Sequence, residues 1–128
     1  MISLMIALLV AAPCAGAEQG LWRTADGSAH IELAPCGQKL CGTVRWIRNP
    51  PVRDLLNPNP ALRGRSLVGV VVIQSVLRDG NRWTGGRLYE PRTGRSYPAR
   101  LSLEGSDQLF VQGCRFGICR GERWTRIR

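Results

Sequence analysis

Apolar and polar residues alternate along most of the chain after residue 20, with the two-residue period of half-buried β-strands. The segments with this pattern, or with a short β-branched run, are 20–25, 29–33, 40–46, 70–77, 82–89, 97–103, 109–112 and 121–127. Turn signals such as Asp26-Gly27 and Asp79-Gly80 separate them at intervals of about eight to twelve residues, as in antiparallel sandwiches and barrels. The pattern therefore predicts an all-β domain.

One stretch, from Asn49 to Gly69, interrupts this rhythm. It holds four of the eight prolines and shows no alternation. Asn59 can cap a short helical turn whose first residue is Pro60, since an asparagine side chain accepts from free amides at a helix start. We expect a long connection that crosses one end of a barrel and packs through its leucines.

The first seventeen residues have the features of a signal peptide. Ile2–Ala12 is almost wholly apolar, and Ala15-Gly16-Ala17 offers the small-x-small pattern that signal peptidase accepts. The apolar run is too short for a transmembrane anchor. Alternatives are a buried N-terminal element and a lipoprotein acylated at Cys14. We expect residues 1–17 to be cleaved, and residues 18–128 to form a single periplasmic or secreted domain.

Four cysteines remain after this cleavage, in two pairs of identical spacing: Cys36 with Cys41, and Cys114 with Cys119. Each pair brackets a glycine, as in a hairpin whose two strands face each other at the cysteines. Among the three connectivities we predict the local one. A four-cysteine zinc site is the alternative, but it usually needs Cys-x-x-Cys spacing and a reducing compartment, so we expect disulfides and no metal.

The formal net charge is +9, and Lys39 is the only lysine among the 18 basic residues. Such a balance favours anionic partners, including phospholipid headgroups and acidic envelope polymers. Export argues against nucleic acid. The arginines are dispersed along the chain, however, so a solvated basic surface is the competing interpretation.

Catalytic motifs are poorly represented. His30 is the only histidine and lies on a regular strand, which fits a surface side chain better than a member of a hydrolase triad. Gly64-x-Ser66-x-x-Gly69 has one residue too many for a nucleophile elbow. We expect neither an enzyme nor a cofactor.

Several motifs together resemble a known family. Gly20-x-Trp22, with Arg123 and Arg126 in the last strand, resembles the closure of lipocalins, in which a first-strand tryptophan packs under an arginine. The wider set is Cys36-x-x-x-x-Cys41-Gly42, Asn57-Pro58-x-Pro60-x-Leu62-Arg63-x-Arg65-x-Leu67-x-Gly69, Trp83-x-Gly85-Gly86-Arg87-x-Tyr89-x-Pro91, Gly94-x-x-Tyr97 and Leu101-x-Leu103. It is similar to the exported bacterial family known as domain of unknown function 2147. The resemblance implies a small lipocalin-like, calycin-type antiparallel barrel in the cell envelope, without an established activity.

Polar residues of the long connection and of one glycine-bearing strand are the candidate ligand-binding residues, because a site needs polar groups beside an apolar wall. They are Asp54, Asn57, Asn59, Arg63, Arg65, Arg87 and Tyr89. Arginines at a barrel mouth can hold a carboxylate or phosphate while the interior takes an acyl chain. These residues could equally cap turns, pair with Asp54 or bond to carbonyls.

The leading functional hypothesis is thus a non-enzymatic binding module for a small amphipathic or anionic ligand. The alternative is a structural or interaction protein of the cell envelope, with a packed interior, a basic surface, and an envelope polymer or protein as partner. An internal cavity would separate the two, and the sequence does not reveal one.

Overall fold

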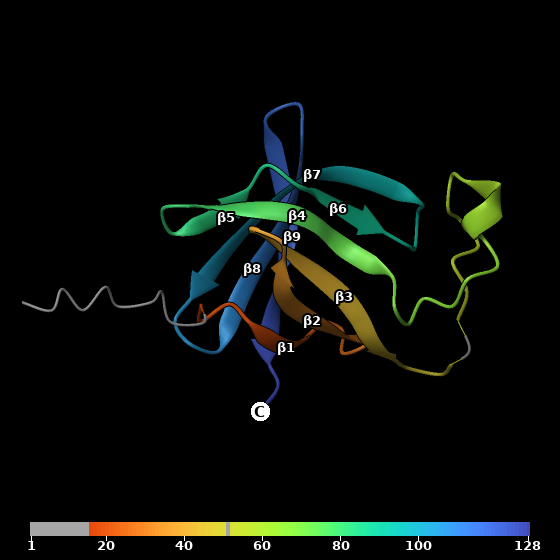
Figure 1. The fold of residues 1–128 in the computed structure, drawn as a ribbon, viewed down its shortest axis with the longest axis horizontal. Coiled ribbons are helices and arrows are strands. Elements are labelled where there is room, and N and C mark those ends of the chain that lie inside the picture. Colours follow the sequence, from red (N-terminus) through yellow and green to blue (C-terminus); the bar gives the residue numbers. More distant parts are fainter. Residues whose placement is uncertain (1–15, 51) are drawn as a thin grey trace, which may run out of the picture.

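The computed structural model describes residues 16–50 and 52–128, and in this part of the chain it is almost entirely β-structure (Figure 1). The strands and the single 3₁₀ turn are β1 (Gly20–Arg23), β2 (Ala29–Cys36), β3 (Lys39–Ile47), η1 (Pro60–Leu62), β4 (Val71–Asp79), β5 (Arg82–Thr84), β6 (Arg87–Glu90), β7 (Arg95–Glu104), β8 (Gln108–Arg115) and β9 (Ile118–Arg126). The predicted signal peptide up to residue 15, with Cys14, lies outside the described residues. The described part contains no helix long and apolar enough to cross a bilayer.

The strands form one closed antiparallel barrel. Each strand pairs with its neighbour in the order β3-β2-β1-β9-β8-β7-β5-β4-β6, and the pairing of β3 with β4 closes the ring. β5 and β6 both lie between β4 and β7 and are separated only by Gly85-Gly86, so they act as two halves of one barrel strand. The result is an eight-stranded barrel, and the predicted all-β barrel is confirmed.

The two ends of the barrel differ. At one end, which we call the closed end, Trp22 is fully buried, and the guanidinium carbon of Arg126 lies 4.3 Å from the centre of its ring. Arg126 also donates to the carbonyl oxygens of Gln19 and Ser106, each at 2.8 Å. The predicted lipocalin-like closure is therefore present with Arg126, whereas Arg123 instead pairs with Glu104 on the surface.

The opposite end, the open end, carries four connections: 24–28, 48–70, 91–94 and 116–117. This follows from the up-and-down order of the strands, because alternate connections fall at the same end of an antiparallel barrel. Most of the largest fully buried side chains, including Leu33, Ile73 and Leu101, fill the barrel interior. The loops that can shape a site are thus gathered at the open end.

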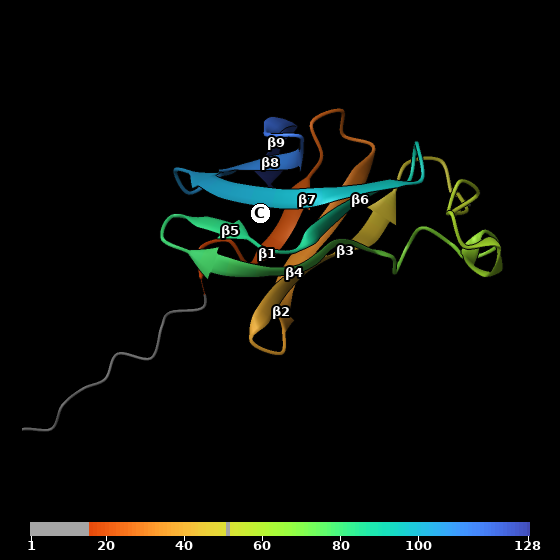
Figure 2. The same ribbon diagram turned by 90° about the horizontal axis from the view of Figure 1, so that it is seen from above.

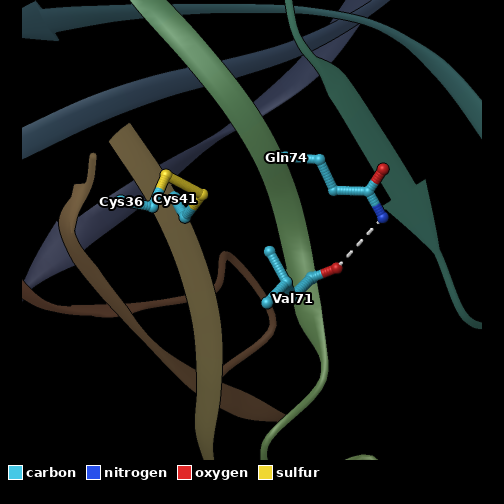
Figure 3. Close-up of a disulfide and its surroundings, with 4 residues drawn as sticks. All are labelled: Cys36, Cys41, Val71 and Gln74. Carbon is cyan, nitrogen blue, oxygen red and sulfur yellow. Dashed lines mark hydrogen bonds between the residues drawn. A yellow bond between two sulfur atoms is a disulfide. The ribbon is translucent and has the colours of Figure 1, made fainter. Parts of the chain in front are cut away.

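Both predicted disulfides are present and local. Cys36 pairs with Cys41 across the β2–β3 hairpin, and Cys114 pairs with Cys119 across the β8–β9 hairpin. Figure 3 shows the first of them beside β4, near the hydrogen bond from the Gln74 amide to the Val71 carbonyl at 3.3 Å. Each disulfide fastens one hairpin and leaves the closure of the barrel to the strands.

The long connection contains the predicted turn, with the Asn59 side chain accepting from the Ala61 amide at 3.1 Å. It projects outward from the open end in both views rather than crossing the barrel (Figures 1 and 2). The reason is that it pairs with itself: Arg53 forms a bridge with Ser66, and the Asp54 amide donates to the Arg65 carbonyl at 3.0 Å. The four leucines of the connection, which we expected to pack, differ in their burial. Leu67 is buried and Leu62 half-buried, whereas Leu55 and Leu56 are exposed.

Candidate functional site

A cavity of about 430 Å³ opens at the open end of the barrel. Its wall is mostly apolar and comes from six different strands and the long connection. The apolar wall residues are Ala29, Ile31, Val44, Ile47, Leu67, Val72, Leu88, Val111 and Trp124. The largest fully buried apolar side chains apart from Val111 do not line the cavity: Trp22, Leu33, Ile73, Val76, Leu101 and Leu109. The barrel is thus filled only in part and retains a space the size of a small ligand site.

Charged side chains form the rim of this cavity. They are Asp26, Glu90, Arg92, Arg120 and Glu122. Three of the nine acidic residues of the chain therefore line a single cavity, against two of its 18 basic residues. The mouth carries both signs of charge and is not a basic patch, in spite of the net charge of +9.

One ion pair connects two loops of the rim. Arg92, in the β6–β7 turn, donates to the carboxylate of Asp26, in the β1–β2 turn, and to the Ser28 hydroxyl at 3.2 Å. Hydrogen bonds from Ser28 and from Arg92 hold the pKa of Asp26 well below its usual range. Asp26 is accordingly a fixed negative charge at neutral pH.

The other three charged residues of the rim, Glu90, Arg120 and Glu122, form fewer contacts with other side chains. Glu122 accepts a hydrogen bond from the Trp124 indole at 2.7 Å, which fixes the ring in the wall. Within residues 16–50 and 52–128, neither Glu90 nor Arg120 forms an ion pair with another side chain. One carboxylate and one guanidinium are thus available to a polar head group at the mouth.

A second polar group, the Asp54 cluster (Asp54, Asn57, Arg65 and Tyr89), attaches the long connection to β6. Asp54 is fully buried and accepts from the Tyr89 hydroxyl, from the Asn57 amide at 2.9 Å and from Arg65 Nε at 2.9 Å. Burial alone would raise the pKa of Asp54, but these hydrogen bonds and the charge of Arg65 outweigh it and lower the pKa. Burial and the neighbouring carboxylate raise the pKa of Tyr89 to about 12.

The structure brings together four of the seven predicted ligand-binding residues, and it places the other three around them or apart. Arg63 Nε donates to the Asn57 carbonyl at 2.8 Å, and Asn59 caps η1. Arg87 lies exposed on β6 and donates to the Ser96 carbonyl at 3.0 Å. Among the seven, only Tyr89 lines the cavity, while the polar groups of the other six contact one another or nearby protein groups.

Other chemistry finds little support in the described residues. His30 stacks on Trp46 with the ring centres 4.3 Å apart, and burial together with Arg23 lowers its pKa. It does not line the cavity. Over 16–50 and 52–128, no three His, Cys, Asp or Glu residues are placed to bind a metal ion.

Reasoning from the sequence missed the rim of the cavity. Asp26 was identifiable only as part of a turn, and Arg92, Arg120 and Glu122 carried no motif. The Pro91-x-x-Gly94 turn signal marked the loop that holds Arg92, but nothing in the local pattern indicated that it would meet a loop 66 residues earlier.

The fold can be compared with known proteins. No curated protein matches the chain. A solved structure of protein HP1028 from the human pathogen Helicobacter pylori, described as belonging to the lipocalin family, is similar with a TM-score of 0.77. The two share 22% sequence identity, over 86% of this chain and 82% of that one, so the likeness concerns the fold alone. A family model described as "uncharacterized protein conserved in bacteria (DUF2147)" matches residues 20–126, and the chain therefore belongs to the DUF2147 family.

Proposed function

We propose that this protein is a non-enzymatic binding module that holds a small amphipathic ligand in the cavity at the open end of its barrel. The cavity itself carries the proposal: about 430 Å³ of space, an apolar wall from several strands, and charged groups confined to the rim. Ligand sites typically combine these features, and eight-stranded barrels can enclose a single small molecule.

The rim bears on the class of ligand. An apolar chain would lie against Val44, Val72 and Val111, and its head group would remain near the mouth. Arg120 can bind an anionic head group, and Glu90 can accept from a hydroxyl or ammonium. A head group that carries both an acceptor and a donor would bind Arg120 through the acceptor and Glu90 through the donor.

In this proposal the Asp54 cluster fixes the shape of the cavity mouth, and Tyr89 connects the cluster to the cavity wall. Tyr89 lines the cavity and donates to Asp54 in the long connection. The polar residues of the long connection then affect the ligand indirectly, because they position the connection beside the mouth: Asn57, Asn59, Arg63 and Arg65. Arg87 likewise acts indirectly, by supporting β6.

The same proposal places the protein outside the cytoplasm. Two disulfides are typical of proteins in oxidising compartments, and the first seventeen residues carry the signal-peptide pattern. The mass of protein isolated from the periplasm should lack residues 1–17 and be lower by about 4 Da for the two disulfides. A mass that retains residues 1–17 would contradict export.

A structural or interaction role in the cell envelope is the alternative. It requires a packed interior and a basic outer surface. The basic surface is compatible with both functions, but the open cavity favours the binding module.

Filling the cavity is the direct test. Val111 is buried in the wall, so Val111→Trp should place an indole in the cavity and weaken binding at least about tenfold, which is ~1.4 kcal/mol. Binding can be measured by fluorescence with dodecyl probes whose head groups are a carboxylate, a hydroxyl or a trimethylammonium.

The matched control is Val71→Trp, which adds the same indole at an exposed position of β4 outside the cavity wall. We expect this variant to bind within about twofold of the unsubstituted protein. Saturable binding that survives Val111→Trp in a folded protein would contradict the proposed site, and so would the absence of binding to every probe.

A further inference from the structure

The tip of the β8–β9 hairpin, residues 114–120, extends beyond the neighbouring strands that pair with β8 and β9. β7 pairs with β8 only as far as the Ala99–Gly113 pair, and β1 reaches β9 only at Thr125 and Arg126. Beyond these points the two hairpin strands pair with each other alone in the described part of the chain. Figure 1 shows the hairpin, in blue, rising above the rest of the barrel. We call residues 114–120 the hairpin tip.

The hairpin tip presents two large apolar side chains to solvent. Phe116 is 89% exposed, the highest value among the large hydrophobic residues exposed in the described chain, and Ile118 is 62% exposed. The guanidinium of Arg115 lies 5.0 Å from the centre of the Phe116 ring. Isolated exposed apolar residues are common on proteins, but here two occur together at the end of a projecting hairpin.

Local structure does not explain the phenylalanine. Arg115 pairs with Ile118 across a two-residue turn whose central residues both have positive φ, +52° at Phe116 and +77° at Gly117. Turns of this kind favour Asn-Gly, because asparagine tolerates the left-handed region that a bulky side chain does not. Phe116 thus combines an unfavourable backbone conformation with nearly full exposure, and it contributes little to the packing of the core.

The hairpin tip is also rigid and basic. The Cys114–Cys119 disulfide joins its two strands directly below the turn, so the apolar side chains are held in place before any contact forms. Residues 114–120 include Arg115 and Arg120 and no acidic residue. Apolar side chains beside arginines suit the interface of an anionic bilayer, where rings enter the acyl boundary and guanidinium groups meet lipid phosphates.

We propose that the hairpin tip docks the protein on an anionic lipid bilayer, with Phe116 and Ile118 inserted at the interface and Arg115 and Arg120 on the headgroups. Phe116 and Ile118 also line a hollow with Leu88 and Tyr97 of the barrel. The arginines beside the exposed Phe116 ring favour the charged interface of an anionic bilayer as the partner. The net charge of +9 adds a long-range attraction to such a surface. Arg120 also lies on the rim of the ligand cavity, but Arg115, Phe116 and Ile118 do not line that cavity, so the proposal needs no bound ligand.

Sedimentation with vesicles tests it, using the protein isolated from the periplasm with both disulfides formed. Vesicles containing phosphatidylglycerol should bind the protein, and vesicles of phosphatidylcholine alone should bind it much less, with added salt releasing it. Phe116→Asn should lower the partition coefficient at least about tenfold, while the melting temperature stays equal or rises because Asn-Gly suits the turn. Arg115→Gln should weaken binding to the anionic vesicles only.

The matched control is Leu77→Asn, since Leu77 is 46% exposed on β4, away from the hairpin tip. It should leave vesicle binding unchanged. Binding to anionic vesicles that persists at full strength in Phe116→Asn would overturn the proposal, because general electrostatic attraction would then explain it. Lipid-free self-association that disappears in Phe116→Asn would also overturn it, because the tip would then contact a second copy of the chain.

Discussion

Replacement of Asp54 by alanine is expected to lower the free energy of unfolding by about 3 kcal/mol. The substitution leaves the buried Tyr89 hydroxyl and Asn57 amide without their acceptor, and removes the partner of Arg65. The Arg65 side chain is 38% exposed and can turn to water, so its share of the loss is small. Urea denaturation of the two proteins at neutral pH gives the difference.

Glu32→Ala is the control for this prediction. Glu32 pairs with Arg45 at 3.0 Å on the outer surface of β2 and β3, where the two side chains are about half exposed. Loss of such a pair should cost less than about 1 kcal/mol. Equal effects of the two substitutions would show that the Asp54 cluster is no more important to the fold than a surface ion pair.

The same cluster should give the stability a pH dependence with a known sign. The pKa of Asp54 is lowered in the folded protein, so its contribution is present above the ordinary value of 3.8 and is lost as the pH falls through the lower, folded pKa. The pKa of Tyr89 is raised from 10 to about 12, so its contribution is complete below pH 10 and is lost between pH 10 and about 12. In Asp54→Ala both losses should be smaller, as urea midpoints measured against pH would show.

Gly86→Ala is expected to destabilise the protein by about 3 kcal/mol or more. A Cβ at this position would lie 2.0 Å from the carbonyl oxygen of Gln74 and 2.7 Å from the carbonyl carbon of Ser75, both backbone atoms of β4. Gly85 and Ser75, on either side of the contact, have positive φ. The backbone of both segments is therefore shaped to bring Gly86 close to β4. The segment with Gly86 cannot move away from β4 without breaking the pairing of β4 with β5 and with β6 on either side.

Gly64→Ala serves as the matched control. Gly64 lies in the long connection without a positive φ, and a Cβ there meets nothing within 4 Å. Its replacement should be neutral or stabilise slightly, because alanine restricts the unfolded chain. A similar loss in both variants, measured by thermal or urea unfolding, would contradict the role assigned to the Gly86 crossing.

Much of the barrel could be predicted because strand patterns are local. The alternation through Ile31 and Leu33 identifies the buried face of β2, and both side chains are buried in the structure. Each cysteine pair likewise lies within a single hairpin, so its spacing is a local signal, and both disulfides form as expected. The resemblance to domain of unknown function 2147 is confirmed over residues 20–126.

The candidate site could be predicted only in part, because it depends on distant pairings. Asp54, Asn57 and Arg65 stood out as polar residues in an unusual segment, but only the fold shows that they contact one another through Asp54. The cavity wall is drawn from six strands, and its rim from two turns and from β6 and β9, so no spacing along the chain marks it. The shape of the barrel decides which side chains share a space, and this shape is set by register and closure.

The pairing of β1 with β9 has a consequence for how the protein folds. This seam joins the first and last strands through two residue pairs, Trp22 with Arg126 and Arg23 with Thr125. Because the proposed export delivers the chain with its N-terminus first, the strands before β9 can pair with one another on arrival, but the ring stays an open sheet until β9 follows. Closing so long a loop is entropically costly and slow, and an open sheet has free edges that can pair with other chains. The last strand therefore ends the period in which the nascent barrel is vulnerable to aggregation.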